Sequence, residues 1–553
     1  MAIYLKLFET HADYSAYING SGKVLPNVSY CEDNNEVHYN PWTYAETYFT
    51  TVAREDGTIS FNIWYSMGTD MITSISYSTD DGETWTTTAN QDNKEGNLVI
   101  DVNVNTGDKV LWKGIATQTG YNDEDDYGSY VGSFFSSDCE FDAKGNVMSL
   151  LYGDNFKGQT TLEENGAFSN LFYDYNEEKT CSIVNAKDLI LPASTLADYC
   201  YYEMFYGCTS LVSTPSLPAT TLADYCYSSM FFGCTSLTSV LILPATTLAD
   251  NCYSYMFGYC TSLTSAPILP ATTLADYCYR SMFGDCTSLT SAPILPATTL
   301  ADNCYYEMFY GCTSLVSAPS LPATTLASRC YDDMFEGCTS LVRVPSLPAT
   351  TLASRCYSNM FFGCTSLVNA PELPATTLAD FCYISMFDGC TSLVSAPILP
   401  ATTLTTGCYN YMFHGCTSLT SAPSLPAITL AEDCYSQMFR GCTSLVSAPI
   451  LPATTLTNTC YNYMFGECTS LVSAPILPAT TLTWGCYSYM FYGCTSLNYI
   501  KAMFTTTPSN TYTQDWLKNV SSSGTFVKNS AAQWNVTGVN GVPSGWTIET
   551  ASE

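Results

Sequence analysis

Residues 217–242, LPATTLADYCYSSMFFGCTSLTSVLI, decide the fold because near copies of this stretch follow one another along the chain. The first copy begins at Leu191, and a new one begins every 26 residues until the twelfth begins at Leu477. A fixed period of this length is typical of a solenoid. A single short unit cannot bury its own apolar face, whereas in a stack each unit covers the next.

Within one copy, several positions barely change, and we expect their side chains to form the core. In residues 217–242 these are Leu222, Cys226, Met230, Phe231, Cys234 and Leu237. The segment 234–239, CTSLTS, predicts a short strand. The segment 223–234, ADYCYSSMFFGC, has near-helical spacing of apolar residues and ends beside Gly233, which predicts one or two helical turns. The predicted fold is therefore a repeat solenoid of short strands and short helical turns.

Cysteine is placed with the same regularity. The chain has 27 cysteines, and 24 of them occupy two fixed positions of the repeat, such as Cys200 and Cys208. In a stack, equivalent positions form ladders, and cysteine is a small apolar side chain that tolerates burial. Disulfides and metal sites are the alternatives, but twelve equivalent thiols have no preferred pairing, and the repeats contain one histidine, His414. We therefore expect buried, reduced thiols.

The repeat resembles the BspA-like, or Treponema-type, leucine-rich repeat. The resemblance rests on the pattern CTSLVSAPxLPATTLxxxCYxxMFxGC and covers residues 191–502, although the period here is longer than the family's usual unit. It implies a solenoid of the leucine-rich-repeat type. It also implies binding, since proteins of that family are mostly surface adhesins for host proteins or other cells, and the family also occurs in proteins of gut bacteriophages. A particular ligand does not follow from the fold.

The composition argues against two classes of partner. The chain has 46% hydrophobic and 12% charged residues, so it has a core to bury. Its formal net charge is −32, to which residues 1–190 contribute 30 acidic against 10 basic residues, and such a field repels nucleic acid. The chain has no run of 18 apolar residues, and its first residues lack the pattern of a secretory signal. We therefore expect no nucleic-acid partner and no membrane insertion.

Both ends of the repeat array, residues 191–502, are predicted to be capped, because the terminal faces of a stack would expose its core. Residues 147–190 look like a degenerate first repeat that caps the N-terminal end. Residues 503–553 form the other cap and contain two alternating stretches, GTFVKN and GWTIET, which predict a closing pair of strands. Residues 46–146 contain stretches such as TISFNIWY that alternate apolar and polar residues, and they predict an N-terminal all-β, β-sandwich-like domain.

Inside that domain, residues 78–85, STDDGETW, resemble the Asp-box of sialidases. The box is a hairpin turn, in which we expect Asp80 to accept backbone hydrogen bonds and Trp85 to pack beneath. Sialidases repeat the box and add an arginine cluster and a tyrosine nucleophile, whereas this sequence has one box and no such cluster. We therefore predict a structural hairpin without sialidase activity.

Residues 1–45 are too short to hold a large core of their own. Their start, which contains LKLFETHADYSAYI, resembles N-terminal segments of proteins from crAss-like phages that infect Bacteroides. The segment suits attachment or assembly; the alternative is a β extension of the next domain. Further along, the acidic stretch 122–126, NDEDD, offers oxygen ligands for calcium but lacks the spacing and glycine of an EF-hand, so we interpret it as a solvated loop.

No set of residues for catalysis is recognisable in the sequence. The three histidines, His11, His38 and His414, are scattered, and GxSxG, HExxH and P-loop motifs are absent. Paired carboxylates at a fixed repeat position would suggest a glycosidase, but Asp198 becomes Ser328 in a later copy. We predict a protein that is not an enzyme and that uses no cofactor and no metal.

The positions that vary between copies flank the predicted helical turn and predict a contact surface. They carry tyrosine, serine, asparagine, aspartate and arginine, and tyrosine gives contact area at low entropic cost. The alternatives are neutral drift on a solvated face, or binding by the sheet face, with Val212, Thr238, Ile268 and Ile294 outward. The predicted ligand-binding residues are Tyr199, Tyr202, Tyr206, Tyr225, Phe232, Tyr255, Tyr259, Arg280, Tyr306, Arg329, Arg355, Phe381, His414, Arg440 and Trp484.

These features predict a binding protein with a fixed core and an editable surface. Our first interpretation is a virion surface or fibre protein, in which residues 1–45 join other virion proteins and the repeats contact a bacterial surface glycan or protein, or mucin. The second is a bacterial BspA-type surface adhesin, and the third is a purely structural virion component. We expect a homo-oligomer or a place in a large assembly.

Overall fold

The computed structural model describes residues 5–8, 28–31, 36–39, 46–63, 72–89, 98–116, 120–122, 130–173, 181–239 and 242–551. The chain divides into two compact units. Unit 1 comprises residues 1–221 and 239–244, and unit 2 comprises residues 222–238 and 245–553. The acidic residues 123–126 and His11 lie outside the described residues, as does most of the segment 1–45.

Unit 1 contains two sheets whose aromatic residues form a common core. The six-stranded sheet has the order β14-β13-β4-β9-β6-β7, and a three-stranded sheet has the order β12-β5-β8. Ring centroids of Phe49 and Phe135 lie 5.1 Å apart, and those of Trp112 and Phe135 lie 5.2 Å apart, so both sheets contribute to one packed interior. The strands are β4 (Phe49–Ala53), β5 (Gly57–Ile63), β6 (Ile72–Ser78), β7 (Thr86–Ala89), β8 (Leu98–Val104), β9 (Lys109–Ala116), β12 (Phe134–Ser137), β13 (Phe141–Asn146) and β14 (Ile183–Ile190).

Unit 1 also contains smaller elements. Strands β1 to β3 form a three-stranded sheet, and β10 pairs with β11. Their bounds, with those of two short helices, are β1 (Leu5–Phe8), β2 (Val28–Cys31), β3 (Glu36–Tyr39), β10 (Gly120–Asn122), β11 (Tyr130–Gly132), α2 (Ser149–Tyr152) and η2 (Gly153–Asn155). The segment predicted to cap the repeats pairs with the first copy, since the amide of Phe168 donates to the carbonyl of Cys200 at 2.7 Å.

The hairpin between β6 and β7 confirms the structural interpretation of residues 78–85. Asp80 accepts a hydrogen bond from the Thr84 amide at 2.9 Å and another from the Ser78 hydroxyl at 2.7 Å. The hydroxyl of Thr84, then its amide and the Ser78 hydroxyl, lower the pKa of Asp80 to about 2. The Trp85 ring packs against Tyr48, with 5.0 Å between centroids. The contacts of residues 78–85 therefore stabilise the turn of this hairpin.

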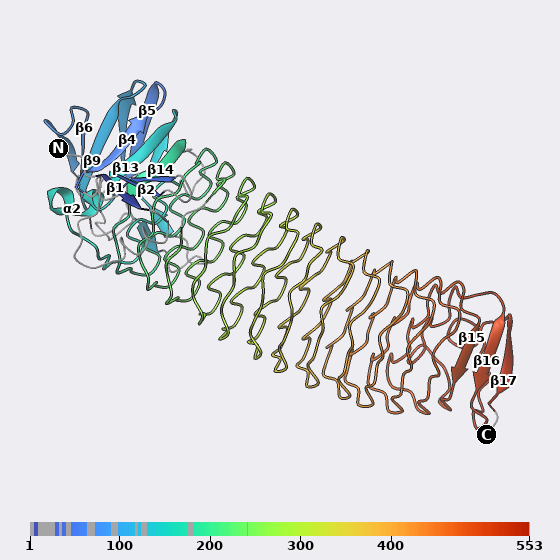
Figure 1. Ribbon diagram of the computed structural model, residues 1–553. Coiled ribbons are helices and arrows are strands. Elements are labelled where there is room, and N and C mark those ends of the chain that lie inside the picture. The colour runs from blue at the N-terminus through green and yellow to red at the C-terminus, as the bar shows by residue number, and fades with distance from the viewer. Residues whose placement is uncertain are drawn as a thin grey trace. The chain divides into compact units, whose positions relative to one another are not determined.

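In unit 2 the repeat copies that follow the first one form a row of coils (Figure 1). Backbone hydrogen bonds join each coil to the next. The amide of Tyr279, for example, donates to the carbonyl of Cys304 at 3.0 Å, and the amide of Phe283 donates to that of Met308 at 3.0 Å. The amides that donate to the next coil alternate along the chain with amides that donate within their own coil. The amide of Met282, for example, donates to the carbonyl of Tyr279 at 3.3 Å.

The predicted helical turns are wrong. In one coil, Tyr277, Ser281 and Asp285 have φ values of 56°, 45° and 56°, and the other coils place left-handed residues at the same spacing. A left-handed residue at every fourth position ends each turn before a helix can continue. Alternate amides also bond to the neighbouring coil instead of to a carbonyl four residues back. The segment is therefore a chain of tight turns.

The predicted short strands are also wrong in extent. Between residues 191 and 498, the described part of the chain contains isolated parallel bridges, such as Ser265 to Ser291 and Thr273 to Thr299, and no continuous strand. The predicted segment starts with a turn, in which the amide of Leu263 donates to the carbonyl of Cys260 at 3.0 Å, and Pro267 and Pro270 beyond it have no amide hydrogen to donate. The parallel pairing along the stack therefore consists of short contacts between turns.

The predicted core positions are confirmed. Leu222, Cys226, Met230, Phe231, Cys234 and Leu237 are each at most 7% exposed. Sequence reasoning missed a further row of tyrosines, in which Tyr279 lies 5.7 Å from Tyr305 with nearly parallel rings. A row of phenylalanines runs beside it, with 5.7 Å between Phe283 and Phe309.

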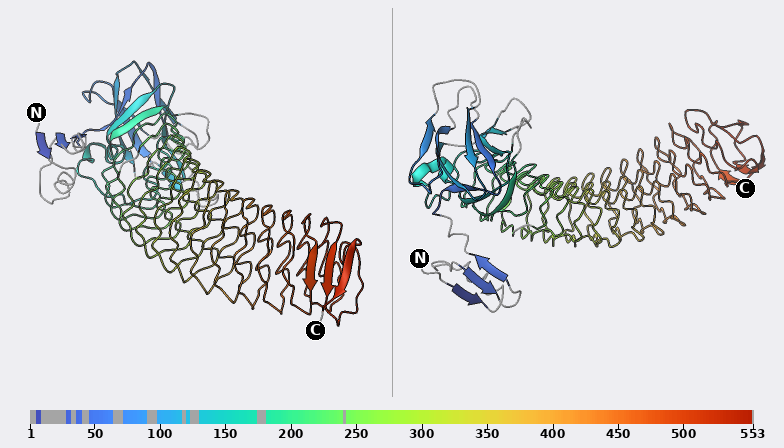
Figure 2. Two further views of the ribbon diagram at one scale, coloured as in Figure 1. Left: turned by 45° about the vertical axis from the view of Figure 1, so that its right-hand side comes forward. Right: turned by 90° about the horizontal axis from the view of Figure 1, so that it is seen from above.

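The C-terminal end of unit 2 closes with a three-stranded parallel sheet, shown in Figure 2. Its strands are β15 (Tyr499–Ala502), β16 (Gly524–Lys528) and β17 (Trp546–Thr550), and the stretches GTFVKN and GWTIET supply the last two. Beside them, the amide of Phe491 donates to the carbonyl of Trp516 at 3.0 Å, and the buried Trp516 ring follows the row of core rings.

Candidate binding surface

The variable strip is the surface formed by positions 9, 12, 13, 16 and 17 of the copies. It follows the chain of tight turns, in which positions 9, 13 and 17 are the left-handed ones. Three of the predicted ligand-binding residues, Tyr199, Tyr202 and Tyr206, belong to unit 1, and the other twelve belong to unit 2. Most of the fifteen side chains are half-buried, whereas Tyr259 is 51% and Trp484, at position 8, is 61% exposed.

Cations of the strip stack on aromatic rings of neighbouring coils. The Arg280 guanidinium lies 5.1 Å from the Tyr255 ring and 5.4 Å from the Tyr306 ring. The Arg355 guanidinium lies 4.7 Å from the Phe381 ring. The structure thus brings together predicted residues that are about 26 residues apart in the sequence.

Other predicted residues pair with carboxylates. The Nδ1 atom of His414 lies 2.8 Å from Oδ1 of Asp388. Arg329 approaches Asp332, with 3.8 Å between Nε and Oδ2. Asp332 is 4% exposed, and its burial, followed by the charge of Asp333, raises its pKa to about 7. A carboxyl group with such a pKa titrates near neutral pH.

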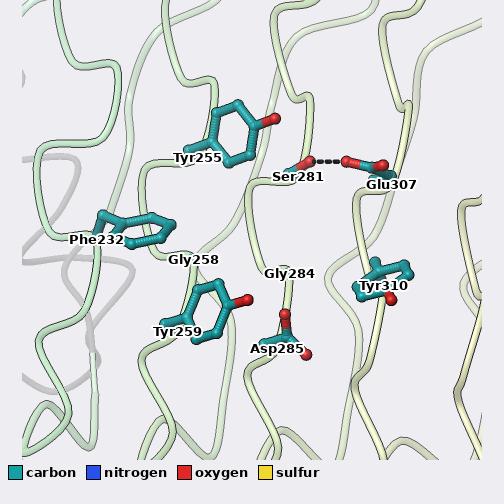
Figure 3. A pocket seen from close by; sticks show the side chains of 9 residues that line it. All are labelled: Phe232, Tyr255, Gly258, Tyr259, Ser281, Gly284, Asp285, Glu307 and Tyr310. Carbon is teal, nitrogen blue, oxygen red and sulfur yellow. Dashed lines mark hydrogen bonds between the residues drawn. The ribbon is translucent and has the colours of Figure 1, made fainter.

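The strip contains a pocket of about 140 Å³ within unit 2 (Figure 3). Gly258 and Gly284 lie at its centre, and four aromatic rings, a serine and two carboxylates surround them. The residues that line it are Phe232, Tyr255, Gly258, Tyr259, Ser281, Gly284, Asp285, Glu307 and Tyr310.

The aromatic walls of the pocket meet at steep angles. The Phe232 ring lies 6.4 Å from the Tyr255 ring at an interplanar angle of 69°. It lies 5.1 Å from the Tyr259 ring at 54°. Tyr310 stands across the glycines from Phe232 and is 38% exposed. The rings therefore present both faces and edges to the space between them.

The polar walls are held by hydrogen bonds. The Ser281 hydroxyl donates to Oε2 of Glu307 at 2.7 Å. The Tyr259 hydroxyl is hydrogen-bonded to Asp285, whose negative charge raises the pKa of Tyr259. Both carboxylates are thereby fixed at the rim of the pocket.

A reversal of two residues creates the pocket. Nine of the twelve copies have glycine at position 17 and a larger residue at position 16, as in Tyr310-Gly311. Copies three and four have the opposite order, so Gly258 and Gly284 leave position 16 without a side chain in two adjacent coils. Tyr259 then has φ 58° and Asp285 has φ 56°, where a residue other than glycine costs about 1–2 kcal/mol. Sequence reasoning missed the pocket, although this reversal is visible in the sequence.

The repeat cysteines are buried and free, as predicted. The Cys260 thiol donates to the carbonyl of Phe231 at 3.1 Å, and the same bond recurs from coil to coil, for example from Cys338 to Phe309 at 3.1 Å. Burial raises the pKa of Cys260 to about 12, so the thiol stays protonated at neutral pH. Among the described residues, no group of three or more histidine, cysteine or acidic side chains is arranged to hold a metal ion.

Comparison with known proteins agrees with the repeat architecture. The family model of the BspA type leucine-rich repeat region, in six copies, matches residues 181–316, 305–429 and 385–531, which together exceed half of the chain. No curated protein matches the chain. In the described part, no helix has the length and apolar character needed to cross a membrane. Proteins of this family are typically extracellular or surface-exposed, and they are generally repeat proteins and adhesins without enzymatic activity. The chain belongs to the BspA type leucine-rich repeat family.

Proposed function

We propose that the protein is a non-enzymatic binding protein whose solenoid contacts a ligand on a bacterial or gut surface through the variable strip. One observation carries the proposal: the strip positions take the widest range of residue types between copies, while exposed position 26 alternates among serine, isoleucine and glutamate and the core rows stay almost constant. Random substitution would also be expected on other exposed positions, yet the exposed threonines at positions 4 and 5 are nearly invariant. A strip that differs from coil to coil above a constant core is expected where selection acts on ligand binding.

We further propose that this protein is a component of the surface or of a fibre of a virion. The support is the resemblance of its first residues to N-terminal segments of crAss-like phage proteins, together with the occurrence of the repeat family in gut bacteriophages. In this proposal residues 1–45 join the chain to other virion proteins. The alternatives are a cell-surface adhesin and a purely structural virion component. The binding test below distinguishes the structural component, which would bind no surface, from the virion surface protein and the adhesin.

The test compares binding of the purified protein to whole gut bacteria, to mucin and to a glycan array. A strip variant carries Arg280→Ala, Tyr306→Ala and Arg355→Ala. Because aromatic and arginine anchors at true hot spots contribute about 2 kcal/mol each, we expect this variant to lose at least ~30-fold in affinity. The thermal midpoint of each variant shows whether the stack is intact.

The control variant changes the sheet face instead. Ile268 and Ile294 are 66% and 80% exposed there, and Ile268→Ser with Ile294→Ser removes apolar surface without touching the strip. We expect this variant to bind like the parent. Loss of binding in the control with full binding in the strip variant would move the contact to the sheet face. No binding of the parent to any surface would favour the structural virion component.

A further inference from the structure

We propose that the pocket around Gly258 and Gly284 binds the quaternary ammonium head of a choline-like ligand. This inference deepens the proposed function, because it names the ligand chemistry of one part of the variable strip. The inference rests on the proposed function in one respect, namely that the ligand is presented on a surface. The geometry of the pocket, its charge and an equivalent place in another copy carry the argument.

The pocket has the walls that a quaternary ammonium prefers. Such a cation is attracted to aromatic faces within about 6 Å of the ring centroid, and several rings at steep angles surround it best. Phe232, Tyr255 and Tyr259 form such a corner, with Tyr310 opposite (Figure 3). A volume of about 140 Å³ suits a small head group with its tail in solvent.

The charge of the pocket is negative. Asp285 and Glu307 line it, whereas Arg280, whose guanidinium lies 5.1 Å from the Tyr255 ring, is a neighbour and not one of the nine lining residues. The field extends to the rim, where the charge of Glu336, then burial and the charge of Asp285 raise the pKa of Tyr310. A neutral sugar would gain nothing from this field, whereas a cation would.

The aromatic walls, which outnumber the two carboxylates, favour a cation without protons to donate. Glu307 already accepts from Ser281, and Asp285 from Tyr259. These carboxylates keep free acceptor sites, but a primary ammonium group is strongly hydrated and would lose more hydration than a quaternary one on entering between aromatic rings. A quaternary ammonium needs no acceptor and uses the carboxylates only through their charge.

Copy eleven shows that this part of the repeat can hold a cation beside a ring and a carboxylate. It has the same reversed order, Gly466-Glu467, and the Arg440 side chain of the preceding coil lies over it. The Arg440 guanidinium is 4.7 Å from the Tyr463 ring, and its Nη2 is 3.4 Å from Oε1 of Glu467. Arg440, Tyr463 and Glu467 occupy the repeat positions of Phe232, Tyr255 and Tyr259 respectively. In copy three the Phe232 ring takes the place of Arg440 over Gly258, so a further cation for this corner has to come from outside, beside the Arg280 guanidinium that lies 5.1 Å from the Tyr255 ring.

The experiment is isothermal titration of the full chain with choline and with 3,3-dimethylbutan-1-ol, its neutral carbon isostere. We expect choline to bind with a Kd in the millimolar range, and the neutral isostere to bind at least about ten-fold more weakly. Equal binding of the two compounds would overturn the proposal, because it would show that the charge does not matter. Tighter binding of Nα-acetyl-lysinamide, Nα-acetyl-argininamide or a methyl glycoside than of choline would overturn it as well.

Two variants locate the site. Gly284→Tyr with Asp285→Gly converts copy four to the ordinary order of Tyr310-Gly311, fills the pocket and removes one carboxylate. We expect it to lose choline binding. Asp285→Asn keeps the shape and removes only the charge, so it should weaken choline several-fold and leave the isostere unchanged. Choline binding that survives both changes would place the site elsewhere.

The matched control makes the same reversal in copy eleven, Gly466→Tyr with Glu467→Gly, and should bind choline like the parent. Loss of choline binding in this control, with its thermal midpoint unchanged, would contradict the assignment. The titration needs no cell, so its failure is distinguishable from that of the proposed function. If choline does not bind but the strip variant still loses adhesion, the pocket inference is wrong and the contact surface stands.

Discussion

At the scale of the residue, the stacked rings of the core carry much of the stability. Phe335 is fully buried between Phe309 and Phe361, with centroid distances of 5.5 and 5.8 Å. Phe335→Ala should lower the free energy of unfolding by about 3–5 kcal/mol, since both neighbours lose a partner and a cavity remains. Urea unfolding followed by circular dichroism measures it. The control is Tyr279→Phe: the Tyr279 hydroxyl has no hydrogen-bond partner among the described residues, so this change should be nearly neutral.

Buried carboxyl groups should make the stack sensitive to pH, and Asp332 is one of three neighbours, with Asp333 and Glu336, whose pKa is raised. Burial and the neighbouring charge of Asp333 raise the pKa of Asp332 from 3.8 to about 7 in the folded chain. Between these values the folded state keeps a proton that the unfolded state has lost, so the free energy of unfolding falls as pH rises from about 4 to about 7. Asp332→Asn, which cannot ionise, should remove at least ~1 kcal/mol of this fall. Unfolding at pH 4.5 and 7.5 compares the two chains; an identical pH dependence would contradict the assignment.

At the scale of the element, the tight turns set which positions need glycine. Gly337 has φ 71°, and the nearest atoms to a new Cβ would be 3.7 Å away, so Gly337→Ala meets no clash. It should still cost about 1–2 kcal/mol, because the left-handed conformation itself is unfavourable for alanine. Gly284 does not have a positive φ and also has room for a Cβ, with the nearest atom at 3.4 Å. Gly284→Ala should therefore change the thermal stability little, and equal losses in both variants would show that the left-handed conformation is not what requires glycine.

The same turns explain how far the sequence could predict the element. The inward rows followed from the constant positions, and burial of Cys226, Met230 and Cys234 confirms them. Their spacing of four residues also looks helical, and this misled the local prediction. Tyr225 and Ser229 have positive φ although neither is glycine, so no residue type indicated the turns. Their hydrogen bonds lead to the next coil, which is invisible within one copy.

The candidate site was predictable only in part, for a related reason. Variation between copies pointed to the strip, and the stacking of Arg280 on Tyr255 joins two predicted residues. The pocket depends on what is missing at Gly258 and Gly284, and an absent side chain attracts no attention in a search for ligands. Comparing the order of glycine and its neighbour across copies would have found it.

At the scale of the whole molecule, the stack should accept or lose entire copies. The amide of Tyr331 donates to the carbonyl of Cys356 at 3.1 Å, and the amide of Tyr357 donates to that of Cys382 at 3.0 Å. Deleting residues 347–372 places Cys382 where Cys356 was, so each donor and ring meets an equivalent partner. Because each repeat contacts only its neighbours, we expect a cooperative thermal transition close to that of the parent.

Deleting only residues 347–359 removes half of this length and places Ala370 opposite Tyr331, so the buried rows lose their register. That chain should unfold from the deletion onward, with loss of cooperative melting; if both deletions melt alike, the coils do not depend on the 26-residue register.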